Sequence, residues 1–187
     1  MLSVLAILGS ARHDGDTARV LDAVLAGRHV THVDLTSRDI RHYEYDRSME
    51  GDDFAALASA MVVHDAVILA TPVYWYAMSG RMKVLFDRFT DLVTVRKELG
   101  RGLRGRSMFV VACGSSPTLP DGFEVPFRDT ANYLHMHYGG IFYAAVTKNG
   151  ELSAELCRAA AAFGAAIFDA VGDVQPSRSG NHPESEV

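Results

Sequence analysis

Short apolar segments alternate with longer segments of helical periodicity along most of the chain, and this alternation constrains the fold more than any other feature. The apolar segments have the length of β-strands and lie at Leu2–Leu8, Val30–Leu35, Ala66–Ala70, Ser107–Cys113 and Gly140–Val146. Ala66–Ala70 is apolar throughout, as expected for a central parallel strand that is buried on both faces. Strands that alternate with helices predict an α/β domain with a doubly wound, five-stranded parallel sheet.

Helical periodicity fills the segments between these strands. Helices are predicted at Thr17–Ala26, at the segment that Asp52 and Asp53 open, and at Met78–Leu99, Phe123–Leu134 and Glu151–Val171. A chain of 187 residues has the size of one domain with a single core. We therefore expect one domain over residues 1–172, followed by a flexible polar tail over residues 173–187.

Charge and composition limit the partners of this chain. The formal net charge is -5 and no basic cluster dominates, which argues against nucleic acid and anionic membranes. Leu2–Leu8 is too short to span a membrane and lacks a basic leader, so we interpret it as a strand rather than a signal peptide. Cys113 and Cys157 form neither a disulfide framework nor a metal quartet, and a cytoplasmic location is the simplest expectation.

A ligand site is expected beyond the carboxyl ends of the strands, at the point where the strand order reverses. In the order 2-1-3-4-5, the loops after strands 1, 3 and 4 meet at that point. These loops are Gly9–Thr17, Thr71–Met78 and Cys113–Pro120, and they carry the most distinctive chemistry of the chain.

The loop Gly9–Thr17 runs from the first strand directly into a helix and predicts a phosphate site. Free N–H groups and the positive dipole of a helix start favour an anion. Ser10 and Thr17 add hydroxyl donors, and Arg12 adds a charged donor. The alternative is an ordinary strand-to-helix turn with Asp16 as the N-cap.

Two other phosphate motifs are excluded. The P-loop sequence GxxxxGK[ST] is absent. A GxGxxG match occurs at Gly100, Gly102 and Gly105, but it follows a helix and precedes a strand, which is the reverse of the dinucleotide-binding context. We interpret this match as a helix-to-strand connection.

The loop Thr71–Met78 contains three consecutive aromatic residues, Tyr74, Trp75 and Tyr76. Exposed rings in a row favour a covering partner, and a flat tricyclic ring system is a good candidate because aromatic faces can frame it. A dimer interface or local packing is the alternative, and the two interpretations are compatible. In the third loop, Gly114 permits close backbone approach and Ser115 offers a hydroxyl, which alone is a weak signal.

Together these loops resemble those of the NAD(P)H-dependent FMN reductases, a group of flavodoxin-like proteins. The phosphate loop of that family, GSxRxxGxT, is matched by Gly9, Ser10, Arg12, Gly15 and Thr17. Its second signature is matched by Pro72, Val73, Tyr74, Trp75, Ser79, Gly80, Lys83, Asp87 and Arg88, and an acidic helix opening by Asp52 and Asp53. The likeness covers residues 2–172.

The resemblance implies a flavodoxin-like sheet of order 2-1-3-4-5, non-covalently bound FMN, NAD(P)H as co-substrate and a homo-oligomer, either a dimer or a tetramer. It implies that Ser10, Arg12, Thr17 and Ala18 hold the phosphate, with Asp16 also at a cofactor-binding position. Pro72, Val73, Tyr74 and Trp75 would line the isoalloxazine, and Gly114 and Ser115 would lie at its far edge. Asp87 and Arg88 are expected to be structural.

Two departures from the family pattern affect these expectations. Asp16 stands where many relatives have asparagine, and Asp14 is close by, so a carboxylate near the phosphate predicts weakened FMN binding. Arg12, the helix end, or a turn of Asp16 toward its own helix would offset this repulsion. The segment His42–Gly51 contains no cysteine, so the iron–sulfur cluster of some related flavoproteins is not expected.

The function implied is transfer of electrons from a nicotinamide to a quinone, azo compound, flavin or similar small acceptor, with no side chain assigned as catalytic. No metal site is expected, because His135 and His137 are two residues apart near a helix end. Cys113 is interpreted as a buried residue ending a strand rather than a redox-active thiol, and His13 as a solvated loop residue. A flavodoxin-type electron carrier and a flavin-free binding or regulatory module are the alternative functions.

Overall fold

Parallel strands form the centre of the computed structural model, which describes residues 2–47, 49–147 and 150–173. These strands are β1 (Val4–Leu8), β2 (Thr31–Asp34), β3 (Ala66–Tyr74), β5 (Ser107–Gly114) and β6 (His137–Ala145), in the spatial order β2-β1-β3-β5-β6. Every neighbouring pair in this path is parallel. The predicted α/β class with a parallel sheet is confirmed.

A sixth strand, β4 (Ala77–Met78), pairs antiparallel with the end of β3 and lies off the parallel path. The prediction of five strands in the order 2-1-3-4-5 is wrong in this respect, because the described sheet has six strands in the order 2-1-3-5-6 with β4 beside β3. A strand of two residues is too short to leave an alternating pattern in the sequence. β3 reaches it by continuing to Tyr74, beyond the predicted end at Ala70.

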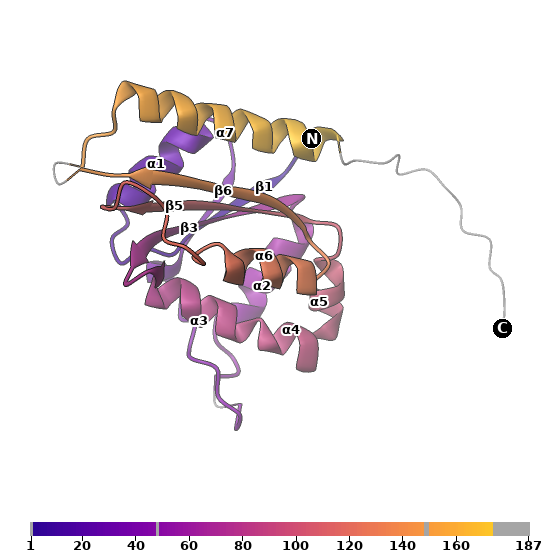
Figure 1. The fold of residues 1–187 in the computed structure, drawn as a ribbon. Helices are drawn as coiled ribbons and strands as arrows, with labels where there is room; N and C mark the ends of the chain where they lie inside the picture. The colour runs from indigo at the N-terminus through magenta and orange to yellow at the C-terminus, as the bar shows by residue number, and fades with distance from the viewer. Residues whose placement is uncertain (1, 48, 148–149, 174–187) are drawn as a thin grey trace.

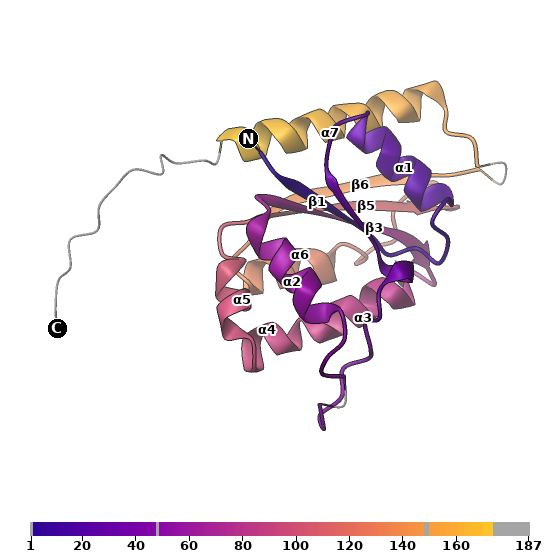
Figure 2. The same cartoon turned by 180° about the vertical axis from the view of Figure 1, so that it is seen from behind.

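Helices cover both faces of the sheet (Figures 1 and 2). One face carries α1 (Asp16–Leu25) and α7 (Ala154–Asp173), and the other carries α2 (Phe54–Val63), α3 (Gly80–Arg88), α4 (Thr90–Thr94), α5 (Lys97–Gly102) and α6 (Val125–Tyr133). Alternate residues of the central strands enter two separate apolar cores. Ile68 packs in the core under α1 and α7, whereas Leu69 packs in the core under α2 to α6.

The single long helix predicted over Met78–Leu99 is instead three helices, α3, α4 and α5. Three consecutive β-branched residues, Val93, Thr94 and Val95, precede the second break, and such residues lose side-chain freedom in a helix. The chain then folds back so closely that a Cβ at Gly100 would overlap the carbonyl oxygen of Leu92. Gly100 and Gly102 belong to α5, and the GRGLRG segment is a helix-to-strand connection, as predicted.

The chain between the short 3-10 helix η1 (Leu35–Ser37) and α2 extends away from the sheet, past α3 (Figure 1). A buried ion cluster joins the end of this segment to the helices. The guanidinium of Arg88 binds the carboxylates of Asp52 and Asp91, and it lies 4.6 Å from the ring centroid of Phe54. Arg88 thus holds α2, α3 and α4 together.

The predicted C-terminal tail and the possibility of a membrane span concern parts of the chain outside the sheet. α7 ends at Asp173, and the rest of the predicted tail over residues 173–187 lies outside the described residues. Among the described residues, no helix is both long enough and apolar enough to cross a membrane.

Candidate functional site

The three loops predicted to form a ligand site converge at the carboxyl end of the sheet. The first loop is tied to β3 and the helix that follows it, because the Gly9 amide donates to the Ala70 carbonyl at 2.8 Å and the Ser79 hydroxyl donates to the Gly9 carbonyl. The Ser79 amide in turn donates to the Thr71 hydroxyl at 3.0 Å. The first and second loops therefore share one hydrogen-bonded network.

The third loop joins the same arrangement through Cys113 and Gly114. The Sγ atom of Cys113 lies 3.3 Å from Oγ1 of Thr17, which is in the first turn of α1. Cys113 is the register partner of Pro72 in the β3–β5 pair, and a Cβ at Gly114 would lie 3.3 Å from Cβ of Val73. The end of β5 is thus fixed against both other loops.

Helix α1 begins without a side-chain cap. Its N-cap is Gly15, and among the described residues no side chain accepts a hydrogen bond from the first turn. The N-terminal N–H groups of a helix need an acceptor, so an uncapped end beside a loop is suited to an anion. Asp16 is not the N-cap: it is the first residue of α1, and its carboxylate binds Arg19 at 2.6 Å.

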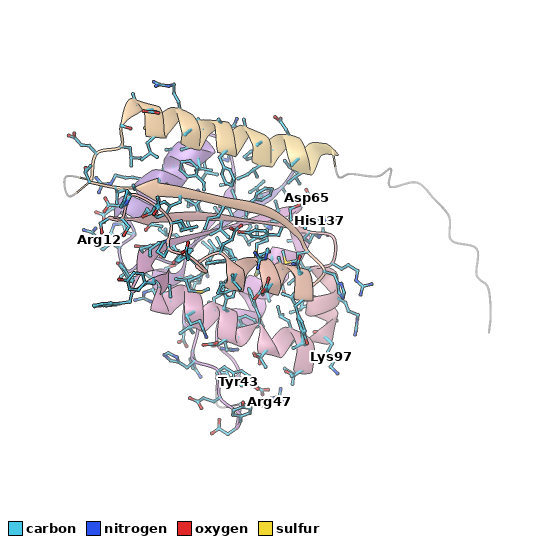
Figure 3. All side chains as sticks on the ribbon, in the orientation of Figure 1. Arg12, Tyr43, Arg47, Asp65, Lys97 and His137 are labelled. Carbon is cyan, nitrogen blue, oxygen red and sulfur yellow. The ribbon has the colours of Figure 1, made fainter. Side chains whose placement is uncertain are left out.

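Side-chain donors surround this helix end. The hydroxyl of Ser10 is buried and accepts from the Arg12 amide at 3.3 Å, while Thr17 is also buried. The guanidinium of Arg12 is exposed and folds back toward Gly15, as the contact of 3.3 Å from a Cβ at Gly15 to Arg12 Nε indicates. Arg12 lies at the end of the sheet opposite Asp65 and His137 (Figure 3). Hydroxyls, a guanidinium and free amides are the donor set that a phosphate requires, so the residues present fit the FMN phosphate.

The aromatic loop is a tight β-hairpin that connects β3 to β4. Tyr74 pairs with Ala77, and the two residues between them, Trp75 and Tyr76, have φ values of 49° and 67°. Two central residues with positive φ define a type I′ turn, a conformation that favours asparagine and glycine and is strained for aromatic residues. The turn holds both rings in solvent, with Trp75 93% and Tyr76 74% exposed.

The predicted residues of the third loop occupy different environments. Gly114 ends β5 in a half-buried position, and Ser115 is exposed. Tyr143, whose place beside this loop is not predicted from the sequence, donates its hydroxyl to the Ser116 carbonyl at 2.7 Å. Burial raises the pKa of this phenol, and Cys113 adds to the effect. Tyr143 therefore remains a neutral hydrogen-bond donor that shapes the loop.

Ser79 also contributes to the site, although the sequence pattern predicts no specific role for it. It caps α3 by accepting from the Met82 amide at 3.1 Å, and it also donates to Gly9. A serine immediately before a helix is a cap signal that the sequence shows. Its second bond, to a loop 70 residues away, leaves no trace in the sequence.

The environment of Cys113 favours the structural interpretation. The residue is 3% exposed, and burial raises the pKa of its thiol; the hydrogen bond with Thr17 opposes this shift and the charge of Asp16 supports it. A thiol that stays protonated and buried is unreactive. Among the described residues, no three histidine, cysteine or acidic side chains gather as a metal site would require.

A family model for NADPH-dependent FMN reductases matches residues 2–150 of this chain. The chain belongs to this family. It is therefore an oxidoreductase that uses FMN and NAD(P)H, and the donor set around α1 and the exposed rings are in keeping with that cofactor.

Individual relatives and solved structures are similar to this chain at low sequence identity. YwqN of Bacillus subtilis, by name an NAD(P)H-dependent FMN-containing oxidoreductase, is 22% identical over an alignment of 161 residues that covers 81% of this chain and 89% of YwqN. Among solved structures, the Trp repressor binding protein of Bacillus subtilis is 19% identical with a TM-score of 0.71, over 86% of this chain and 97% of that one. An NADPH-quinone reductase of P. pentosaceus is 17% identical with a TM-score of 0.64, over 87% and 98%. Both solved structures have the same fold as this chain.

Proposed function

We propose that the three converging loops bind FMN and that the loaded protein passes electrons from NAD(P)H to a small planar acceptor. The observation that carries this proposal is that hydrogen bonds connect the three loops. Ser79 binds Gly9, and Cys113 binds Thr17. Three loops from distant parts of the chain are held in one arrangement at the switch point of the sheet, which is where ligands bind in such folds.

The phosphate is assigned to the start of α1. Ser10 and Thr17 supply hydroxyls, Arg12 supplies a guanidinium, and Asp16 and Ala18 supply backbone N–H groups of the uncapped first turn. The helix dipole and these donors together favour a doubly charged anion. The Asp16 side chain is directed to Arg19, which lowers its repulsion of the phosphate.

The isoalloxazine is assigned to the second and third loops. Pro72, Val73 and Tyr74 are the last residues of β3, and Trp75 begins the turn. These residues line one side of the ring system, with Gly114 and Ser115 at its far edge. The rings of Trp75 and Tyr76 are exposed and held by the strained turn. They offer stacking faces for a nicotinamide or for the acceptor.

When bound, FMN supplies hydride acceptance from NAD(P)H and onward electron transfer to the acceptor. The side chains of this protein orient the partners, and none is assigned as an acid or base in the hydride step. The acceptor proposed is a quinone, azo compound, free flavin or similar small molecule, and the fold shared with a quinone reductase supports a quinone as the first to be tested.

The visible spectrum of the purified protein tests this function, together with mass identification of the released flavin. We expect a flavin spectrum, release of FMN, and steady NAD(P)H oxidation when a quinone is added. Arg12→Ala should weaken FMN binding about tenfold, whereas Arg158→Ala, an exposed arginine on α7, should leave binding unchanged. A protein that takes up no FMN contradicts the proposal, and one that binds FMN without oxidising NAD(P)H is an electron carrier.

We also propose that the protein is a homo-oligomer that associates through the groove between α4, α5 and α6. Two adjoining hollows of 420 and 560 Å³ line this groove and share Val93, Tyr133 and Leu134. Val93, Val125 and Tyr133 are among the exposed large apolar side chains of the described residues. A contiguous exposed apolar surface is typical of a protein interface.

The charges at the two ends of this groove favour a second copy of the chain as its occupant. Asp129, which pairs with Arg128 at 3.0 Å, lies at one end, whereas Lys97, Arg101 and Arg104 lie at the other. A two-fold axis through the residues that the two hollows share would place the basic end of each copy against the acidic end of its partner.

Both cysteines are free thiols, which supports the proposed cytoplasmic location.

A further inference from the structure

Cys113 lies where the three loops of the site meet. Its Sγ atom contacts Thr17 of α1 at 3.3 Å, and its backbone lies between Pro72 of β3 and Ala144 of β6 in the sheet register. The next residue, Gly114, ends β5 and leads into the third loop. One side chain therefore links the helix start assigned to the phosphate with the strands that carry the other two loops.

The contact between Thr17 and Cys113 is buried. Thr17 is 2% exposed, and Cys113 is similarly enclosed. Within the part of the chain that the structure describes, it is the one side-chain hydrogen bond that joins α1 to the sheet. The rest of the α1 interface is apolar packing of residues such as Val20 and Leu21, which is less directional than a hydrogen bond.

Either atom of this hydrogen bond could be the donor. When the protonated thiol donates its one hydrogen, Thr17 Oγ1 is the acceptor. When Oγ1 accepts that hydrogen, the proton of the Thr17 hydroxyl is free for another acceptor. At the uncapped start of α1, an anion bound to the helix is the natural acceptor.

We infer that Cys113 is a positioning residue, which acts through Thr17 to align the start of α1 and gives the site its preference for FMN over riboflavin. Riboflavin has the same ring system and lacks the phosphate, so only FMN benefits from an aligned helix start. This inference rests on the proposed function of the three loops.

Flavin titrations of the flavin-free protein test the inference through binding rather than turnover. FMN and riboflavin are added separately, and quenching of flavin fluorescence gives the two dissociation constants. Cys113→Ala should weaken FMN binding about three- to tenfold, the value of one hydrogen bond, and leave riboflavin binding within about twofold. Cys113→Ser, which keeps a donor, should restore most of the preference.

Thr17→Val provides the second arm of the experiment. It should lower FMN binding by at least as much as Cys113→Ala, and the double variant Thr17→Val/Cys113→Ala should bind FMN no more weakly than Thr17→Val alone. Cys157→Ala, the other cysteine, should match the wild type. If Cys113→Ala fails to fold, the preference for FMN over riboflavin is compared between Cys113→Ser, which should keep most of it, and Thr17→Val, which should lose it.

The outcomes separate this inference from the proposed function. Equal weakening of FMN and riboflavin by Cys113→Ala would show a packing role and overturn the inference, as would an unchanged ratio. A wild type that binds both flavins equally also overturns it and leaves the flavin site standing. A wild type that binds neither flavin overturns the proposed function itself.

Discussion

Arg19 binds the carboxylate of Asp16 at 2.6 Å across one turn of α1, beside the helix end to which the FMN phosphate is assigned. The sequence alone presents Asp16 as a negative charge near a phosphate, and this pairing changes that interpretation. The charge is directed to a cation on the same helix, in the i,i+3 geometry that stabilises helices. Tight FMN binding is therefore compatible with Asp16.

The pair predicts opposite effects for its two members. Arg19→Ala leaves Asp16 unpaired near the phosphate and should weaken FMN binding about tenfold at low salt. Asp16→Asn frees Arg19 and should strengthen binding about threefold, and Asp16→Asn/Arg19→Ala should return it to the wild-type value. Fluorescence titrations with FMN at low and high salt check this, with riboflavin as the uncharged control. Equal binding by all variants would mean that the phosphate lies elsewhere.

The type I′ turn at Trp75 and Tyr76 predicts that the protein gains stability when the turn is relaxed. Both residues have positive φ, which costs an aromatic residue about 1 kcal/mol. Tyr76→Gly should therefore raise the free energy of unfolding by about 1 kcal/mol in a urea titration, while NAD(P)H oxidation falls because a stacking face is lost. Tyr74→Gly is the matched control, since Tyr74 pairs with Ala77 in the strand and glycine there should destabilise. Loss of stability in Tyr76→Gly would contradict the strain.

The buried cluster around Arg88 predicts a specific acid sensitivity. Burial raises the pKa of Asp52, but hydrogen bonds from Arg88 and from the Arg41 and Phe54 amides outweigh it, and the net pKa lies below the ordinary 3.8. A carboxyl whose pKa is lowered on folding stabilises the fold above its unfolded pKa and loses this contribution as pH falls through its folded pKa. The contribution of Asp52 should therefore be complete at pH 7 and disappear below about pH 4.

Asp52→Asn tests this sensitivity. The variant should lose about 3 kcal/mol of unfolding free energy at pH 7 because Arg88 loses a buried partner, and the difference from wild type should shrink below about pH 4. Urea titrations across that range measure both. Asp87→Asn removes an exposed pair with Lys83 and should change stability by less than about 0.5 kcal/mol at every pH. A constant difference between Asp52→Asn and wild type would contradict the titration of Asp52.

The sequence was sufficient to predict that the three loops meet at one end of the sheet, because strand periodicity and loop order depend on local patterns. Ala66–Ala70 and Ser107–Cys113 are buried strands as predicted, and the loops after them meet the first loop at one end of the sheet. The general rule for ligand sites in parallel sheets then applies directly. Whether each predicted residue contacts FMN remains a prediction.

The features that the sequence did not predict depend on tertiary contacts. Trp75 and Tyr76 have no propensity for a type I′ turn, so β4 is formed by the surrounding structure rather than by turn residues. The break in the helix after Thr94 depends on α5 packing against Leu92 through Gly100. The pairing of Asp16 with Arg19, in contrast, was visible as an i,i+3 spacing and could have been predicted.

The groove between α4, α5 and α6 predicts that a single buried charge dissociates the proposed oligomer. Val93 lies in the middle of the groove, where both hollows share it. Val93→Glu should therefore place a carboxylate in the interface and convert the protein to a monomer, as light scattering after gel filtration would show. Val63→Glu is the matched control, because Val63 is an exposed valine at the end of α2, outside the groove, and it should leave the mass unchanged.

The charges of the groove add a complementary test of how the two copies are arranged. Arg101→Glu/Arg104→Glu makes the basic end acidic, and Asp129→Lys makes the acidic end basic. Each variant alone should associate more weakly, since like charges face each other across the two-fold axis. A mixture of the two should form dimers again, because every acidic end then meets a basic one. A wild type that is a monomer, or an oligomer that all of these variants leave intact, would show that the copies associate through another surface or not at all.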